Sequence, residues 1–266
     1  MWSNRWHELK SYLFFLRDAR GPHGVHSPFV YQLITVVLRD KNRSSKFQLI
    51  EQERKQLRKS QDVIEVQDFG AGSRMNNGTM RSVADIARIA LQPAKNAHAI
   101  ALLAKHAGAV NILELGTSLG VTTAHLAAYL PYSSVYTIEG SSAIAEVAQN
   151  VWKRADLNSI DITTGSFANV LDFVLAKMQS VDFVIIDGDH RGEACLSYLD
   201  KIIPYTTERT VFILDDIYWS PSMTDAWNQC VSDERFSLTL DFFDFGVLYR
   251  SKGRVKEHFK LYRPWL

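Results

Sequence analysis

The sequence has few of the features that mark secreted, disulfide-rich or membrane-spanning proteins. Only two cysteines occur, Cys195 and Cys230, far apart and outside any CxxC pattern, which argues against a disulfide framework and against a zinc site. The first residues show no signal-peptide pattern, and no apolar run is long enough to cross a bilayer. We therefore expect a cytoplasmic protein with no membrane partner.

An excess of charge of one sign is also absent. The 266 residues include 30 Lys and Arg against 29 Asp and Glu, for a formal net charge of +1. This balance argues against a nucleic-acid partner, although a local basic surface stays open. A hydrophobic fraction of 46% predicts an ordinary globular core.

Strand and helix patterns alternate after Gly108. Five apolar runs separated by helical patterns occur at Asn111–Leu115, Val135–Ile138, Asp161–Thr163, Val181–Ile186 and Val211–Leu214. Two closing strands, near Ser237–Phe242 and Gly246–Arg250, are close enough to form a hairpin. The pattern predicts an α/β fold with a Rossmann-like, doubly wound sheet that is mostly parallel and carries an antiparallel C-terminal hairpin strand. We place this domain at residues 91–266 and a mainly helical N-terminal extension at residues 1–90.

The extension begins with an apolar helical stripe. Its members recur at spacings of three and four: Trp2, Trp6, Leu9, Leu13 and Leu16. We expect this face to pack on the main domain or on a second subunit, which leaves a homodimer open; a helix lying on a membrane surface is the remaining alternative. In the following segment His23–Phe29, the two histidines either reach a pocket or cap a helix.

The strongest local signal is a buried strand that runs into a glycine-containing turn and then a helix, Ile112–Gly120. Gly116 lets the backbone turn tightly and approach a ligand closely. Glu139 ends the next strand, 23 residues later. A carboxylate at this spacing can accept hydrogen bonds from both ribose hydroxyls of a nucleoside. The alternative interpretation of Glu139 is a solvated acid at a strand end.

The turn lacks the glycines that a dinucleotide requires. Ser118 occupies the middle glycine position, and no third glycine follows at the required place, since Thr122 and Thr123 come next. Glu114 would repel a pyrophosphate but could attract an amino group. These features favour S-adenosylmethionine, which carries an amine and a sulfonium but no phosphate. A second glycine-rich stretch, Gln67–Ser73, is not followed by a helix start, so we interpret it as a turn near the pocket or a structural turn.

Carboxylates follow the fourth and fifth strands of the domain. Asp187 follows one strand, and Asp215 and Asp216 end the other, so a parallel sheet would bring them together at one edge. Clustered carboxylates repel unless they share protons or bind a cation. A divalent ion such as Mg²⁺ is the simplest resolution, and plain strand termination is the alternative.

These motifs resemble the catechol O-methyltransferase-like group of class I S-adenosylmethionine-dependent methyltransferases. The resemblance rests on ILELGTSLG, the strand ending in Glu139, Thr164–Phe167, VIIDGDH and ILDDIYWS, and it covers roughly Ala94–Arg250. The segment His23–Phe29, with DFGAGS and DDIYWS, resembles an uncharacterised bacterial methyltransferase family.

The resemblance implies a role for each matching position. The methionine end of the cofactor would be lined by Glu114, Gly116 and Ser118, the ribose by Glu139, and the adenine by Ser166 and Phe167. Asp187 would lie beside the cofactor and take part in catalysis. The metal ligands would be Asp187, Asp215 and Asp216. His190 would fall where metal-dependent relatives carry a catalytic lysine, and Asp216 stands where they usually carry Asn. Both departures put a catechol substrate in doubt.

The sequence therefore predicts an S-adenosylmethionine-dependent methyltransferase that acts on a hydroxyl of a small molecule, with a divalent metal as an open question. Methylation of RNA such as tRNA is one alternative, and a non-catalytic nucleoside-binding or scaffold protein is another. The aromatic residues Tyr218, Trp219, Phe243 and Phe245 either line the acceptor pocket or belong to the core. The acceptor itself is not encoded in any of these motifs.

Overall fold

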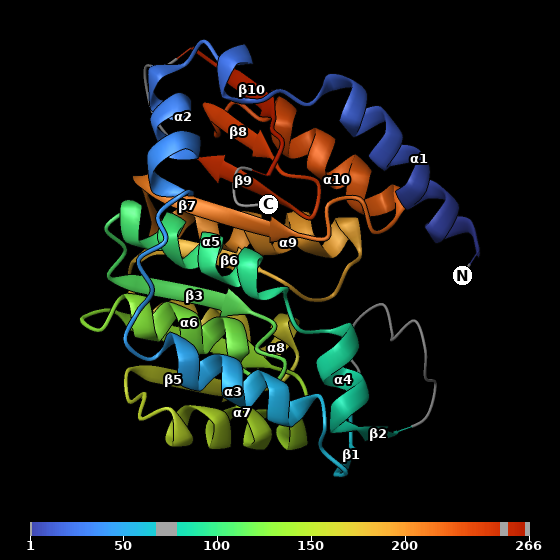
Figure 1. Ribbon diagram of the computed structural model, residues 1–266, viewed down its shortest axis with the longest axis vertical. Coiled ribbons are helices and arrows are strands. Elements are labelled where there is room, and N and C mark those ends of the chain that lie inside the picture. Colours follow the sequence, from blue (N-terminus) through green and yellow to red (C-terminus); the bar gives the residue numbers. More distant parts are fainter. Residues whose placement is uncertain (1, 68–78, 251–254, 264–266) are drawn as a thin grey trace.

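An eight-stranded sheet forms the centre of the protein (Figure 1). The computed structural model describes residues 2–67, 79–250 and 255–263. The sheet contains β3 (Asn111–Leu115), β4 (Ser134–Glu139), β5 (Ile160–Thr164), β6 (Val181–Ile186), β7 (Thr206–Asp215), β8 (Leu238–Asp241), β9 (Phe245–Tyr249) and β10 (Glu257–Lys260). Their order in space is β10-β8-β9-β7-β6-β3-β4-β5.

The strand directions confirm the predicted fold class. Strands β5, β4, β3, β6 and β7 are parallel to one another, whereas β9 runs antiparallel to both β7 and β8. The predicted β8–β9 hairpin is therefore present. The sequence patterns did not reveal β10, which adds a parallel edge strand beside β8. Because the chain proceeds from β3 to β4 on one side and later returns to β6 on the other, a crevice opens at the carboxyl end of β3.

Helices cover both faces of the sheet (Figure 1). One face carries α5 (Ala94–His106), α6 (Val121–Tyr129) and α7 (Ser142–Arg154), and the other carries α8 (Phe167–Met178), α9 (Gly192–Ile202) and α10 (Pro221–Ser232). Alternation along β3 shows why both faces are apolar: Ile112 packs in the cluster of α5 and α6, whereas Leu113 packs in the cluster of α8 and α9. Both β3 side chains are fully buried.

The N-terminal extension wraps around this core. It contains α1 (Trp2–Asp18), α2 (Pro28–Gln32), a π-helical turn (Leu33–Val37), α3 (Phe47–Leu57), the antiparallel pair β1 (Val63–Glu65) and β2 (Met80–Ser82), and α4 (Val83–Ile89). Leu33 and Ile34 are buried in the same cluster as α5 and α6. The boundary at residue 90 stays a prediction, and Asp68–Ser73 of the second glycine-rich stretch lie outside the described residues.

The α1 stripe is expected to pack on the main domain or on a second subunit, and three of its residues do not pack on the main domain. Trp6, Leu9 and Leu13 are 66%, 50% and 61% exposed, and Phe15 is the buried residue of the helix at 3%. The helix is apolar on two sides, and the side that includes Phe15 contacts the ring of Phe243. In the described part of the chain, no helix is long and apolar enough to span a membrane.

Candidate active site

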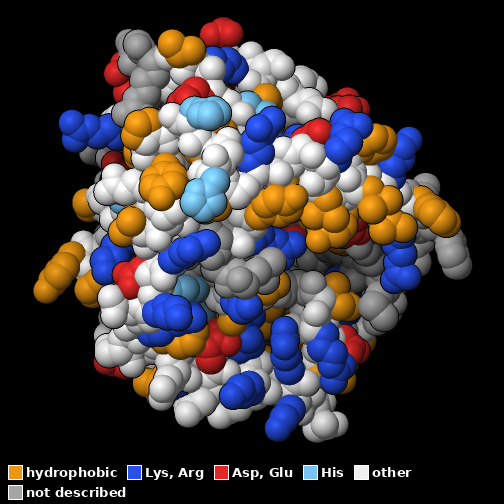
Figure 2. Space-filling view, turned by 45° about the horizontal axis from the view of Figure 1, so that its top comes forward, with side chains coloured by type: hydrophobic (Ala, Val, Ile, Leu, Met, Phe, Trp, Pro, Cys, Tyr) orange, Lys and Arg blue, Asp and Glu red, His pale blue; other side chains and the backbone are white. Residues whose placement is uncertain are grey.

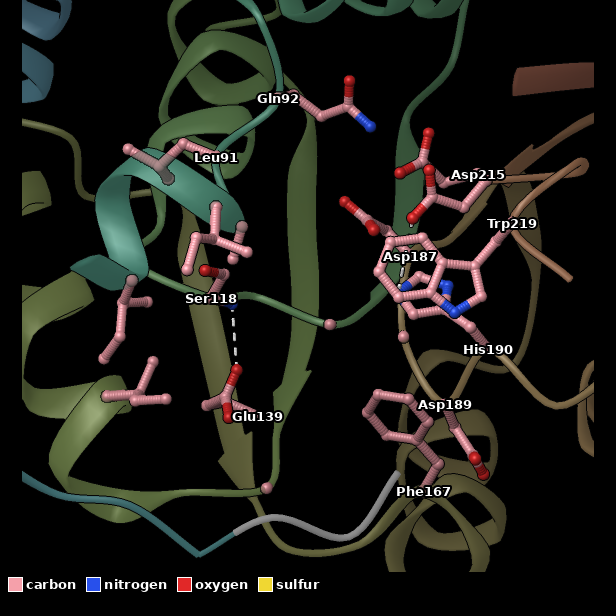
Figure 3. Close-up of a pocket in the computed structure, with 18 of the residues that line it drawn as sticks. Leu91, Gln92, Ser118, Glu139, Phe167, Asp187, Asp189, His190, Asp215 and Trp219 are labelled. Atoms are coloured by element: carbon pink, nitrogen blue, oxygen red, sulfur yellow. Dashed lines mark hydrogen bonds and ion pairs between the residues drawn. The ribbon is translucent and has the colours of Figure 1, made fainter. Parts of the chain in front are cut away.

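A cavity of about 1010 Å³ lies at the carboxyl ends of the central strands (Figure 3). Nearly all of the predicted site residues line it: Gly116, Ser118, Glu139, Ser166, Phe167, Asp187, His190, Asp215 and Asp216. They come from the loops after β3, β4, β5, β6 and β7. The parallel sheet therefore brings together residues that are spread over a hundred positions of the sequence.

The loop after β3 takes a shape that requires glycine. Gly116 has a φ of +103°, and a Cβ atom there would overlap the backbone carbonyl oxygen of Asp187. Gly120, with a φ of +75°, begins α6 at a point where a Cβ would collide with Ala148 and Trp152. Ser118 also has a positive φ of 49°. The loop can therefore lie directly against the β6 end, which leaves its backbone exposed to the cavity.

Two backbone N–H groups hold the carboxylate of Glu139. Ser118 N donates to Oε2 at 2.9 Å, and Ser141 N donates to Oε1 at 3.0 Å (Figure 3). The carboxylate is thus fixed between the loop after β3 and the start of α7. It is half-buried at the cavity wall, where its remaining lone pairs suit the two hydroxyls of a ribose.

Glu114, predicted to lie beside the cofactor, is a buried residue of β3. It is absent from the cavity lining and 1% exposed, and its Oε2 accepts hydrogen bonds from Thr123 at 2.5 Å and Thr137 at 2.7 Å. Burial raises the pKa of this carboxyl to about 8, although the two threonine hydroxyls oppose the shift. The residue therefore ties β3 to β4 and α6, and its role toward a cofactor stays a prediction.

Replacing Glu114 with Gln should flatten the pH dependence of stability. The pKa is about 8 in the folded protein against an ordinary 4.5, so the folded state holds the extra proton and stability falls as the pH rises between these values. One such group contributes a slope of roughly 1.4 kcal/mol per pH unit. Urea unfolding at several pH values measures it, with the exposed Glu146→Gln as control. Equal slopes in wild type and Glu114→Gln would contradict the assignment.

Asp187 and Asp215 form a close carboxyl pair at the ends of β6 and β7. Burial raises the pKa of Asp187, and burial together with the negative charges of Asp187 and Asp216 raises that of Asp215 well above its usual range. The amide nitrogen of Gln92 points toward the two carboxyls (Figure 3) and opposes the rise in both pKa values. Two buried carboxyls this close favour sharing a proton or binding a cation.

His190 lies beside this pair. Its Nε2 is 3.8 Å from Oδ2 of Asp216, a separation suited to charge attraction but too long for a hydrogen bond. The imidazole packs against the Trp219 ring at a centroid distance of 5.4 Å. The turn bearing Asp216, with a φ of +52°, is held by a 2.8 Å hydrogen bond from its N–H to the carbonyl of Asp244.

Asp189 stiffens the loop that carries His190. It accepts hydrogen bonds from Arg191 Nη2 and Tyr198 Oη, both at 2.7 Å. Burial alone would raise the pKa of Asp189, but these partners outweigh it and lower the pKa. Tyr198 also packs edge-on against Phe167 at 5.6 Å, which places the Phe167 ring at the cavity wall as predicted for an adenine contact.

The predicted metal ligands all line the cavity but do not converge on one point. Among the described residues, no group of three or more His, Cys, Asp or Glu side chains is arranged to hold a metal ion. Asp216 faces His190, while the amide of Gln92 points toward Asp187 and Asp215. One feature still suits a cation: Oδ1 of Asp215 is buried and accepts no hydrogen bond from the described residues.

Several lining residues were not found from the sequence. Leu91, Gln92 and Asn96 come from the connection between α4 and α5 and the start of α5, and no strand-end pattern marks them. The four aromatic residues that could line the pocket or belong to the core do both. Tyr218, Trp219 and Phe243 line the cavity, whereas Phe245 is fully buried in the core. His23 and His26 are exposed and lie outside the cavity lining.

A family model matches the central part of the chain. Residues 113–217 match the model described as a methyltransferase domain. The chain carries a methyltransferase domain. Its range runs from β3 to the residues just after β7 and includes Glu139, Asp187 and His190. No curated protein matches the chain at significant similarity.

Solved structures share the fold of this methyltransferase at low sequence identity. An O-methyltransferase from Bacillus cereus in complex with S-adenosylhomocysteine is 21% identical, with a TM-score of 0.55 over 84% of this chain and 97% of that chain. The O-methyltransferase TomG from Streptomyces achromogenes, in complex with S-adenosylmethionine, is 15% identical, with a TM-score of 0.56 over 84% and 95%. A methyltransferase from Podospora anserina bound to S-adenosylhomocysteine is 13% identical, with a TM-score of 0.58 over 86% and 97%. The resemblance to class I S-adenosylmethionine-dependent methyltransferases is confirmed for the domain and the fold.

Proposed function

We propose that this methyltransferase transfers a methyl group from S-adenosylmethionine to a hydroxyl of a small molecule. The observation that carries the proposal is the sharing of one cavity by two kinds of site. Glu139, suited to a ribose, lies on one side, and Asp187, Asp215, Asp216 and His190 lie on the other. A volume of about 1010 Å³ has room for a cofactor and an acceptor together.

The cofactor would lie across the carboxyl ends of β3 and β4. Glu139 would bind the ribose, Gly116 and Ser118 the methionine end, and Ser166 and Phe167 the adenine. Ser118 supports this assignment, because its buried Oγ has no hydrogen-bond partner among the described residues. Two of the solved relatives hold S-adenosylhomocysteine and one holds S-adenosylmethionine, which supports the same cofactor class here.

Methyl transfer would be an in-line displacement. The acceptor oxygen attacks the sulfonium methyl, a C–O bond forms, the C–S bond breaks, and S-adenosylhomocysteine leaves. His190 would accept the proton of the hydroxyl, and the nearby Asp216 carboxylate would stabilise the resulting imidazolium. Trp219 holds the imidazole in place by ring packing. Most of the acceleration would come from positioning the two reactants within the cavity.

A divalent cation is a separate part of the proposal. Asp187, Asp215 and Asp216 would be its ligands. Oδ1 of Asp215, which has no hydrogen-bond partner in the described part of the chain, supports such a role. When bound, the ion would supply positive charge that lowers the pKa of an acceptor hydroxyl. The arrangement of Asp216 toward His190 and the contacts of Gln92 are the features that speak against a preformed site.

Removal of divalent ions tests the metal directly. We expect EDTA treatment to lower turnover by at least about tenfold, with recovery on addition of Mg²⁺, because the charge on the hydroxyl would be lost. Binding of S-adenosylhomocysteine, measured by calorimetry, should stay unchanged and serves as the control for an intact fold. Full turnover after chelation would show that the carboxyl cluster works without a cation.

Two measurements test the proposed function itself. Calorimetry should show binding of S-adenosylhomocysteine and none of NAD, since the loop lacks the glycines that admit a pyrophosphate. A panel of hydroxylated small molecules should then yield at least one acceptor that releases S-adenosylhomocysteine in the presence of S-adenosylmethionine. Tight NAD binding, or no affinity for S-adenosylhomocysteine, would overturn the assignment.

One observation favours methylation of RNA as a second candidate. Residues 39–59 contain eight Lys and Arg against three Asp and Glu, a net +5, so the rest of the chain carries 1 − 5 = −4. Lys55 on α3 and Arg58 and Lys59 just after it are exposed, and Arg88 at the cavity rim donates to the carbonyl of Arg58. A salt-sensitive mobility shift with tRNA would support this candidate over a small acceptor.

A further inference from the structure

Helix α1 is fixed to the body of the protein by one of its sides. Phe15 is buried and lies 5.5 Å from the ring of Phe243, and Tyr12 packs edge-on against the same ring at 4.8 Å. His7 Nε2 and Thr224 Oγ1 of α10 form a 2.9 Å hydrogen bond. Contacts therefore anchor the helix along its length, and its opposite side has a defined orientation.

That opposite side is apolar and open to solvent. Trp6, Leu9 and Leu13 are 66%, 50% and 61% exposed. Their spacings of three and four residues place them on one face of the helix. Figure 2 shows hydrophobic side chains in a row along the edge of the molecule that α1 forms. We call Trp6, Leu9 and Leu13 the outer face of α1.

Cations flank the outer face. At about 100° per residue, Lys10 and Arg17 fall on one side of it and Arg5 on the other, while the acids Glu8 and Asp18 fall on the half of the helix toward the body. Arg5, Lys10 and Arg17 are exposed. Arg17 pairs with Asp18 at 3.0 Å, which leaves Arg5 and Lys10 as the cations on this half that form no ion pair with the described residues. The outward half of the described helix therefore combines an apolar stripe with positive charge and contains no acidic residue.

This charge pattern decides between two occupants. In a pair of α1 helices from two copies of the chain, the residues that flank the apolar seam face one another, so Arg5 and Lys10 would meet cations of the partner. A negatively charged surface with an apolar interior has no such conflict. The surface of a bilayer that contains anionic lipids has both properties, because cations bind its head groups while Trp and Leu enter the acyl boundary.

We propose that the outer face of α1 docks on the surface of an anionic lipid bilayer, with the helix parallel to the membrane plane. Trp6 is the type of residue that favours the membrane–water interface, and Leu9 and Leu13 extend the apolar contact beside it. The helix lies on the membrane and does not cross it, in keeping with the absence of a spanning helix among the described residues.

Docking in this way places the cavity next to the membrane. Glu8 of α1 and Phe243, which packs against α1, both line the cavity. Figure 2 shows the surface hollowed beside the hydrophobic row. The inference does not depend on methyl transfer, because lipid binding can be measured without a substrate.

Co-sedimentation of the full chain with lipid vesicles tests the proposal. We expect binding to vesicles of phosphatidylcholine with phosphatidylglycerol, and little binding to phosphatidylcholine alone. Added salt should weaken the binding, because the cations act at the surface. A variant with Trp6→Ser, Leu9→Ser and Leu13→Ser should lose at least about tenfold in affinity, since three apolar side chains no longer enter the bilayer.

A matched control changes exposed apolar residues elsewhere. Val36, Leu49 and Val110 are 62%, 47% and 55% exposed, and their replacement by Ser should leave vesicle binding unchanged. Unaltered binding of S-adenosylhomocysteine would show that both variants are folded and keeps this test separate from that of the proposed function. Equal binding by the α1 variant and wild type, or no binding to anionic vesicles, would overturn the proposal. So would a dimer that dissociates in the α1 variant, because the occupant would then be a second copy.

Discussion

Replacing Glu139 with Gln should weaken the binding of S-adenosylhomocysteine about 100-fold. The carboxylate accepts backbone hydrogen bonds from Ser118 and Ser141, at 2.9 and 3.0 Å, and keeps lone pairs for the ribose hydroxyls. Gln offers one oxygen and one NH₂ group, so a donor would face the N–H of Ser118 or Ser141. Hydrogen bonds to a charged group are worth roughly 1.5–3 kcal/mol each, and about 1.4 kcal/mol corresponds to a factor of ten.

Calorimetry of the variant gives this loss directly, and a nearby acid supplies the control. Glu146 is exposed on α7, the helix that follows Glu139, and Glu146→Gln changes the net charge by the same amount. We expect the control to bind like wild type. A Glu139→Gln protein that is folded and binds with undiminished affinity would remove Glu139 from the cofactor site, and with it the main support for the proposed ligand.

The sequence predicts the central part of this site because strand ends are visible in it. Glu139, Asp187 and Asp215 each follow an apolar run, and parallel strands place such positions at one edge of a sheet. Gln92 does not follow an apolar run, so the sequence pattern does not identify it. It lies between α4 and α5 and reaches the carboxyl pair because Arg54 of α3 donates to its backbone carbonyl at 2.5 Å. That contact joins segments 38 residues apart and depends on tertiary packing alone.

At two further places, Glu114 and α1, the sequence did not show in which direction the side chains point. Glu114 stands just before the glycine turn, but alternation along β3 puts it on the same face as Ile112, under α6, where Thr123 binds it. For α1, periodicity identifies the stripe of Trp6 and Leu13 but not which apolar side of the helix meets the body. Phe243 decides that question, and it is more than 200 residues away.

Replacing His190 with Ala should lower turnover about 10²- to 10⁴-fold and leave the affinity for S-adenosylhomocysteine unchanged. This range is typical for loss of a general base. The imidazole lies at the acceptor side of the cavity, 3.8 Å from Asp216, and no described hydrogen bond links it to the loop that carries Ser118. Its removal therefore affects proton transfer and leaves the cofactor contacts in place. Release of S-adenosylhomocysteine with an acceptor from the panel measures the effect.

Two variants distinguish the base from a packing role of the same ring. His26→Ala removes an exposed histidine outside the cavity and should be indistinguishable from wild type. Asp216→Asn keeps the imidazole but removes the charge that would stabilise its protonated form, so we expect a smaller loss than for His190→Ala. Undiminished turnover in folded His190→Ala would exclude this imidazole as the base. The proton would then have to leave through the carboxyl pair or through water.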